Sequence, residues 1–204
     1  MPEIKIEETK VKYKDVFNLK NLYVMMHEYL AEEKWFAEEG SVKGDVSKQH
    51  RYIESLYLEQ FYQKGLHQGG KEMWIYWRLF KKPEGRYSSY LRYRLNVDFH
   101  GVYLQDIEVM HQGKKVKAQK GEMEIFFNGA VQTDYRDEWK NHWFLKNFQE
   151  IYEARIISQE LQKHEKQLWR EIYKLTAVVK RYLDMRVFIP TPEPFTPKLY
   201  GMEG

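Results

Sequence analysis

The sequence contains no cysteine, and this absence removes several classes of chemistry at once. Disulfide bonds, thiolate zinc sites, iron–sulfur clusters and a cysteine nucleophile all require the missing thiol. A chain of 204 residues that folds as one domain buries roughly 70% of its unfolded surface. We therefore expect a single core that needs neither a disulfide nor a metal.

Surplus charge and long apolar runs are also lacking. The 33 basic and 30 acidic residues leave a net charge of +3, which is too small to favour nucleic acid as the partner. No apolar run approaches the roughly 18 to 20 residues of a membrane span, and the acidic first residues lack the apolar core of a secretion signal. These features predict no transmembrane segment and a cytoplasmic location.

Catalytic motifs are missing as well. The pair Gly69-Gly70 is followed by neither a Lys-Ser or Lys-Thr pair nor a convincing helix, so it does not form a phosphate-binding loop. No serine nucleophile elbow, HExxH motif or calcium loop occurs. Asp98 and His100 have a spacing that suits acid–base chemistry, but a solvated strand face has the same pattern. We assign no catalytic residue, metal ligand or cofactor and expect a protein that is not an enzyme.

The N-terminal part combines strand and helix patterns. Residues 3–13 alternate weakly between apolar and charged positions, as in a short edge strand or a pair of strands. Apolar residues within 15–64 recur at helical spacing and predict two helices, the second at 47–64. Asp15 or Asn18 can cap the first of these helices.

Residues 71–135 have a period of two, which predicts an antiparallel meander of about four long strands. Apolar and polar side chains alternate cleanly along 89–100, so we expect one buried and one solvated face. A change of phase near Gln105-Asp106 indicates a β-bulge, and Gly113 suits a hairpin turn before the last strand.

The stretch 139–184 contains neither glycine nor proline and predicts a long closing helix. Forty-six helical residues would span about 69 Å, whereas a compact domain of this length is roughly 43 Å across. We therefore expect the helix to project beyond the body, with a break near 159–166 as the alternative. An apolar stripe at its start comprises Trp143, Phe144, Phe148, Ile151 and Tyr152. A heptad seam for protein–protein association comprises Leu168, Ile172, Leu175, Val179 and Tyr182.

Aromatic residues make up 16% of the chain and open two further alternatives. Bulky rings could line a cavity for an apolar small molecule or lipid. The candidate ligand-lining residues are Trp74, Tyr76, Trp77, Tyr93 and Phe127. Basic residues interleaved with aromatic ones could instead bind nucleic acid, although Glu122 and Glu124 would oppose part of this row if the strands pair. The candidate nucleic-acid-binding residues are Arg78, Lys81, Lys82, Arg86, Arg92 and Arg94.

The order of elements, with a strand, two helices, an antiparallel meander and a long helix, resembles the helix-grip (START-like) architecture. In that architecture a curved sheet wraps a final helix and leaves an apolar cavity, so the resemblance implies a ligand-binding fold. The segments 25–30, MMHEYL, and 71–79, KEMWIYWRL, are similar to an uncharacterised family of small archaeal proteins. This second likeness implies no known activity.

Together the patterns predict an α+β fold in which an antiparallel sheet of about four to six strands packs against helices and a long C-terminal helix. We expect a single domain at 1–186 and a proline-rich, extended tail at 187–204. The leading functional prediction is non-enzymatic binding, in which the helix seam associates with a protein partner or a second copy. Binding of an apolar ligand, and then of nucleic acid, are the alternatives.

Overall fold

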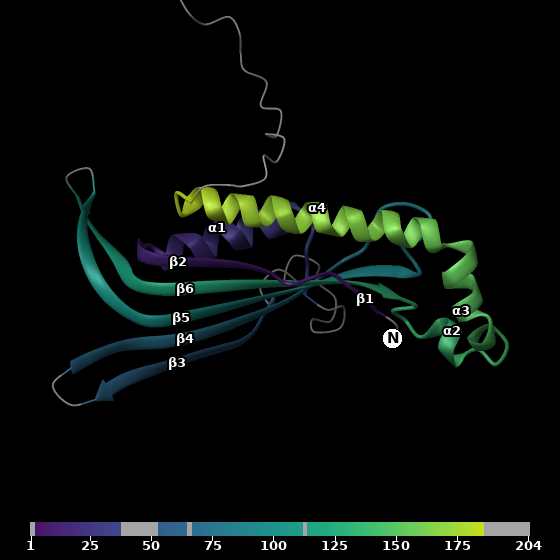
Figure 1. The fold of residues 1–204 in the computed structure, drawn as a ribbon, viewed down its shortest axis with the longest axis horizontal. Helices are drawn as coiled ribbons and strands as arrows, with labels where there is room; N and C mark the ends of the chain where they lie inside the picture. Colours follow the sequence, from purple (N-terminus) through teal and green to yellow (C-terminus); the bar gives the residue numbers. More distant parts are fainter. Residues whose placement is uncertain (1–2, 38–52, 65–66, 112–113, 186–204) are drawn as a thin grey trace, which may run out of the picture.

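The computed structural model describes residues 3–37, 53–64, 67–111 and 114–185. The predicted proline-rich tail lies outside these residues. Within them, the chain forms a six-stranded antiparallel sheet with α1 and α4 on one face, which confirms the predicted α+β class (Figure 1). The strand order is β1-β6-β5-β4-β3, and β2 also pairs with β6.

The strands are β1 (Glu3–Lys5), β2 (Thr9–Phe17), β3 (Glu54–Lys64), β4 (His67–Lys81), β5 (Leu91–His111) and β6 (Lys114–Thr133). The helices are α1 (Leu19–Glu32), α2 (Glu138–Asn141), α3 (Gln149–Ile151) and α4 (Ser158–Tyr182). A 3₁₀ turn, η2 (Leu145–Asn147), and a π-helical turn, η3 (Tyr152–Ile156), connect the last three helices.

The N-terminal segment folds as a pair of strands followed by a capped helix. Both β1 and β2 pair antiparallel with β6. The side chain of Asn18 accepts a hydrogen bond of 2.9 Å from the backbone N–H of Asn21 and so caps α1, as the sequence indicates. The helix ends before Lys34, whose φ of 62° is left-handed and incompatible with a further helical turn.

The second predicted helix, at 47–64, is wrong for the residues that the structure describes. Residues Glu54–Lys64 form β3, which pairs antiparallel with β4. Tyr57 and Phe61 have helical spacing, but Leu56 and Leu58 also share one face of a strand. Pairing with the long strand β4 decides between the two periods, and this partner is not visible in the local sequence.

The core lies between the sheet and the helices, and side chains fill its centre. The large side chains that share this space with less than 2% exposure include Leu22, Met26, Met73, Ile75, Trp77, Tyr93, Phe99 and Phe127. The structure therefore confirms which side chains of β4, β5 and β6 the alternation assigns to the buried face. Helix α4 packs tightly on β6 at Gly129, where an added Cβ would lie 2.5 Å from Cδ1 of Ile172.

A β-bulge bends the far half of the sheet. The β5–β6 register shifts between Val102 and Gln105, and Tyr103 has a φ of 52°. This is close to the predicted position. Leu104 packs over Gly101, where a Cβ would come within 2.5 Å of its side chain, so the glycine makes the bend possible. Beyond it, the β5–β6 hairpin curves away from the rest of the sheet (Figure 1).

The register places the acidic row of β6 away from the arginines of β5. Glu124 lies opposite His100, whereas Arg92 lies opposite Gln132 and Arg94 opposite Ala130. The expected cross-strand pairing of Glu122 and Glu124 with these arginines is therefore wrong. The register places Glu122 opposite Val102, and both Glu122 and Glu124 instead form ion pairs with lysines of β2.

The predicted unbroken helix at 139–184 is also wrong. The helical segment is interrupted at Ile157, whose backbone N–H donates to the carbonyl of Tyr152. The chain changes direction at this point (Figure 1). Ile157 is 1% exposed, so the break turns an apolar side chain into the core. The remaining helix α4 has 25 residues, which corresponds to about 37 Å.

The heptad seam of α4 is not available for association. Leu168, Ile172, Leu175 and Val179 are at most 1% exposed because α4 packs against the chain's own sheet and α1. Tyr182 is half-exposed, and its hydroxyl donates to the carbonyl of Asn18. The seam prediction is therefore corrected, since a stripe that seals a sheet has the same spacing as one that meets another helix.

Candidate functional site

The five predicted ligand-lining residues do not form one site. Trp77, Tyr93 and Phe127 belong to the inward face and are fully buried. Trp74 and Tyr76 lie on the outer face, since their neighbours Met73, Ile75 and Trp77 point inward. Of the five, Tyr93 alone lines a described cavity.

The outer face of β4 and β5 carries a row of stacked rings. Trp74 stacks on His100 at 3.6 Å between ring centroids and on Tyr76 at 6.2 Å. His100 is also 2.7 Å from a carboxylate oxygen of Glu72. The predicted pair of Asp98 and His100 thus has separate partners, because Asp98 binds Arg78.

Three of the six predicted nucleic-acid-binding residues pair with carboxylates of the chain, and the other three contact an amide or aromatic rings. Arg78 pairs with Asp98, Arg94 with Glu3 at 2.8 Å, and Lys81 with Glu171 at 2.9 Å. Arg92 donates to Gln132 and stacks on Phe80. Lys82 and Arg86 lie over the rings of Tyr135 and Tyr87. A surface whose cations already have anionic partners attracts phosphate weakly.

A cavity of about 750 Å³ lies where the helices meet the end of the sheet. It is lined by the end of α1, the residues after β4, the start of β5 and one face of α4, and we call it the end cavity. Its lining residues are Glu32, Glu33, Lys34, Phe36, Ala37, Phe80, Lys81, Lys82, Pro83, Glu84, Arg92, Tyr93, Gln167 and Glu171. Eight of these fourteen residues are charged, with both signs present, and the remaining ones add apolar surface, so the lining is of mixed polarity.

Tyr93, which lines the end cavity, is joined to a buried histidine. Its hydroxyl lies 2.6 Å from Nδ1 of His164. Burial raises the pKa of Tyr93 and lowers the pKa of His164. Burial therefore favours the neutral form of both groups, and the tautomer of the imidazole decides whether the tyrosine hydroxyl donates to Nδ1 or accepts from it. The pair is suited to position a polar group but carries no charge for acid–base work.

The most unusual surface is formed by residues 143–156. Its large apolar side chains are exposed, and we call them the aromatic patch: Trp143, Phe144, Phe148, Ile151 and Ile156. Trp143 is 78% exposed, and its ring lies 5.6 Å from that of Phe144, which in turn is 4.7 Å from Phe148. The patch includes four of the five residues of the predicted stripe, whereas Tyr152 turns inward.

Anchoring contacts hold this segment in place. Asp134 accepts hydrogen bonds from the backbone N–H groups of Trp139 and Lys140 at 3.0–3.1 Å and so fixes the start of α2. The ring of Trp139 packs on Tyr152 at 4.6 Å, and Tyr90 contacts both rings. The segment therefore buries one aromatic face against the body and presents the other. In Figure 1 it lies at one end of the molecule, next to the start of α4.

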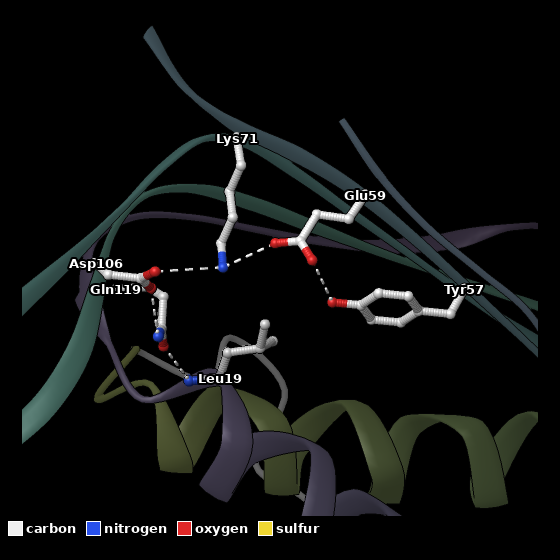
Figure 2. A network of polar contacts seen from close by, with 6 residues as sticks. All are labelled: Leu19, Tyr57, Glu59, Lys71, Asp106 and Gln119. Atoms are coloured by element: carbon white, nitrogen blue, oxygen red, sulfur yellow. Dashed lines mark hydrogen bonds and ion pairs between the residues drawn. The ribbon is translucent and has the colours of Figure 1, made fainter. Parts of the chain in front are cut away.

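A polar network joins the strands at the other end of the sheet (Figure 2). Lys71 Nζ lies 2.9 Å from Glu59 and 3.4 Å from Asp106. Gln119 donates to Asp106 and accepts from the backbone N–H of Leu19, the first residue of α1. The network links four strands to α1. Its charged groups therefore have a structural role, because each bonds to a residue of a neighbouring element.

The comparisons with known proteins assign no family. Searches of protein-family models, curated proteins and solved structures found no match. The similarity to the helix-grip architecture and to small archaeal proteins therefore stays a prediction. In the parts of the chain that the structure describes, no three His, Asp or Glu side chains gather as a metal site requires. No helix there is both long and apolar enough to cross a bilayer.

Proposed function

We propose that this protein is a non-enzymatic interaction protein that docks the aromatic patch into a groove of another protein. The observation that carries the proposal is the exposure of five large apolar side chains on a segment whose backbone is anchored. The rings of Trp143, Phe144 and Phe148 are in contact with one another in sequence, and exposed apolar surface of this kind is typical of interaction sites. Each such side chain contributes roughly 1.5–3 kcal/mol when it is fully buried, so a partner that covers the patch has a substantial driving force.

The rings at the centre of the patch form one cluster. The ring of Phe148 lies 4.7 Å from that of Phe144 across the turn η2, and Ile151 ends the short helix α3, so consecutive short turns and not one continuous helix present these side chains. Trp143 extends the patch to one side, and a tryptophan in such a place is a frequent energetic centre of an interface.

The charges around the patch favour a protein over a membrane. Residues 136–155 contain four basic and four acidic side chains, namely Arg136, Lys140, Lys146, Arg155, Asp137, Glu138, Glu150 and Glu153. A segment that binds an anionic membrane surface carries a cationic excess on its polar face. A balanced charge pattern instead suits the polar rim of a protein interface.

Site-specific photocrosslinking tests the proposal. A photoreactive residue at Phe148 should give a discrete crosslinked protein in an extract of the source organism, and Trp143→Ser should abolish this product. A photoreactive residue at Val24, an exposed apolar position on α1, is the matched control. Equal products from positions 148 and 24, or sedimentation of the chain with anionic vesicles in place of a protein product, would contradict the proposal.

A second candidate function is the binding of a small polar ligand in the end cavity. Its volume of about 750 Å³ lies within the usual range of roughly 300–1,000 Å³ for ligand pockets. Because eight of its fourteen lining residues are charged, including Lys81, the ligand would carry polar groups that match them. Native mass spectrometry of the purified chain should then show a bound small molecule that is lost in Lys81→Met.

A further inference from the structure

Strand β3 leaves an unusual edge on the sheet. Among the described residues its backbone pairs with β4 alone, so its other side faces outward. Leu56, Tyr57, Leu58 and Phe61 are exposed, Phe61 by 72%. No proline or lysine interrupts residues 54–61. The β3–β4 register shifts between Glu54 and Leu56 and again between Phe61 and Gln63, so the regular edge that can template pairing with another strand is the stretch 56–61.

The opposite edge of the sheet is protected, which makes the contrast informative. There, β2 carries Lys10, Lys12 and Lys14 at alternate positions, and β1 has only three residues. Edge lysines and short edge strands are common means by which proteins prevent strand pairing. Within the described ranges, lysines and a short strand therefore block one edge, whereas no strand pairs with the other.

We infer that β3 pairs with β3 of a second copy of this chain, in antiparallel orientation about a two-fold axis at Tyr57. Symmetry limits the possible registers. Successive residues of a strand present their backbone hydrogen-bonding groups to opposite sides. A residue of β3 can therefore face only a residue an even number of positions away, and one residue must face its own copy on the axis.

Among these registers, the one centred on Tyr57 matches the side chains best. It places Leu56 opposite Leu58, and Tyr57 opposite itself. Glu59 then lies near Ser55 of the other copy, at the register shift that ends the regular stretch, so it does not meet its own copy. Centring on residue 58 would place Tyr57 opposite Glu59, and centring on 59 would place two carboxylates face to face, which is unfavourable.

The outer face supports the same occupant. Leu56 and Leu58 are register partners of Tyr76 and Trp74 on β4, so they extend the row of stacked rings toward the sheet edge. A second copy would continue this apolar surface across the axis with its own leucines and rings. Self-complementarity of both the edge and the flanking face is what a symmetric, isologous interface requires.

Crosslinking through introduced cysteines tests the register, and the absence of native cysteine makes the result unambiguous. Tyr57→Cys should give a covalent dimer upon treatment with a short bifunctional thiol reagent. Phe61→Cys is the control, since residue 61 would face residue 53 and its two copies would be about 26 Å apart. Equal crosslinking of both variants, or none of Tyr57→Cys, would overturn the register.

A charge exchange tests the dimer itself. Light scattering should give twice the chain mass of 24.9 kDa for the parent protein. Leu56→Glu and Leu58→Lys should each give monomers, because a charge would then face a leucine. The double variant should recover the dimer, since the carboxylate introduced at position 56 would face the ammonium group introduced at position 58 of the other copy. Both positions are exposed, so circular dichroism should show unchanged folding. A monomeric parent protein at all concentrations, or a double variant that stays monomeric, would overturn the inference.

Discussion

The tight contact between α4 and the sheet at Gly129 provides a sharp test of how the core is packed. An added Cβ at Gly129 would lie 2.5 Å from Cδ1 of Ile172, while its next neighbours, in Leu168 and Ile6, are 3.5 and 3.6 Å away. Gly129→Ala therefore conflicts with a single methyl group. Ile172 is 1% exposed, so this methyl has little space into which it can move. Overpacking of this kind costs about 1–3 kcal/mol.

Gly129→Ala should change from destabilising to stabilising when the methyl group Cδ1 of Ile172 is removed. Ile172→Val deletes Cδ1 and by itself costs about 0.5–1.5 kcal/mol. In that background Gly129→Ala meets only ordinary contacts and should stabilise the fold by about 0.5–1 kcal/mol, because glycine is unfavourable within a strand. In the parent chain the same substitution should destabilise.

Urea unfolding of the parent, both single variants and the double variant measures this coupling directly. We expect the two mutations to be non-additive by about 1–3 kcal/mol, with the double variant more stable than Ile172→Val. Equal effects of Gly129→Ala in both backgrounds would refute the close approach of α4 to β6 and with it the described packing.

Three further predictions follow from individual contacts. Tyr90→Phe should lower the free energy of unfolding by about 1–3 kcal/mol, because it removes the 2.6 Å bond from the tyrosine hydroxyl to Glu153, and unchanged urea unfolding would contradict this. Burial lowers the pKa of His164, so stability should fall as the pH drops below the ordinary histidine value of about 6.5. His164→Gln should show a weaker loss between pH 7.5 and 5.5, and an identical loss would contradict the burial. Trp143→Ser should leave the free energy of unfolding within about 0.5 kcal/mol of the parent value, because the side chain is largely exposed, and a larger change in urea unfolding would show that the ring supports the fold.

The sequence predicts those parts of the fold in which the local pattern and the final environment agree. The alternation along β4 and β5 identifies the inward face correctly, and Asn18 is recognisable as a cap because its effect is local. The strand β3 is missed because its conformation depends on pairing with β4, a partner that the local pattern of 54–64 does not reveal.

The candidate site shows the same division. The stripe at 143–152 is visible as apolar spacing, but spacing alone does not distinguish a buried face from an exposed one. The structure separates Tyr152, which packs on Trp139, from Phe144 and Phe148, which face outward. Conversely, the seam around Ile172 has the spacing of an interface but is covered by the chain's own sheet. Only the long-range packing decides which stripe is free.

The affinity of the crosslinked partner for two variants tests the central claim most directly. Phe148→Ser should raise the dissociation constant at least about 30-fold, since an aromatic side chain at the centre of an interface contributes about 2 kcal/mol or more. Val24→Ser, which alters an exposed apolar side chain on α1, should leave the dissociation constant unchanged. Equal dissociation constants for the parent chain and Phe148→Ser would contradict the assignment of the aromatic patch as the docking surface.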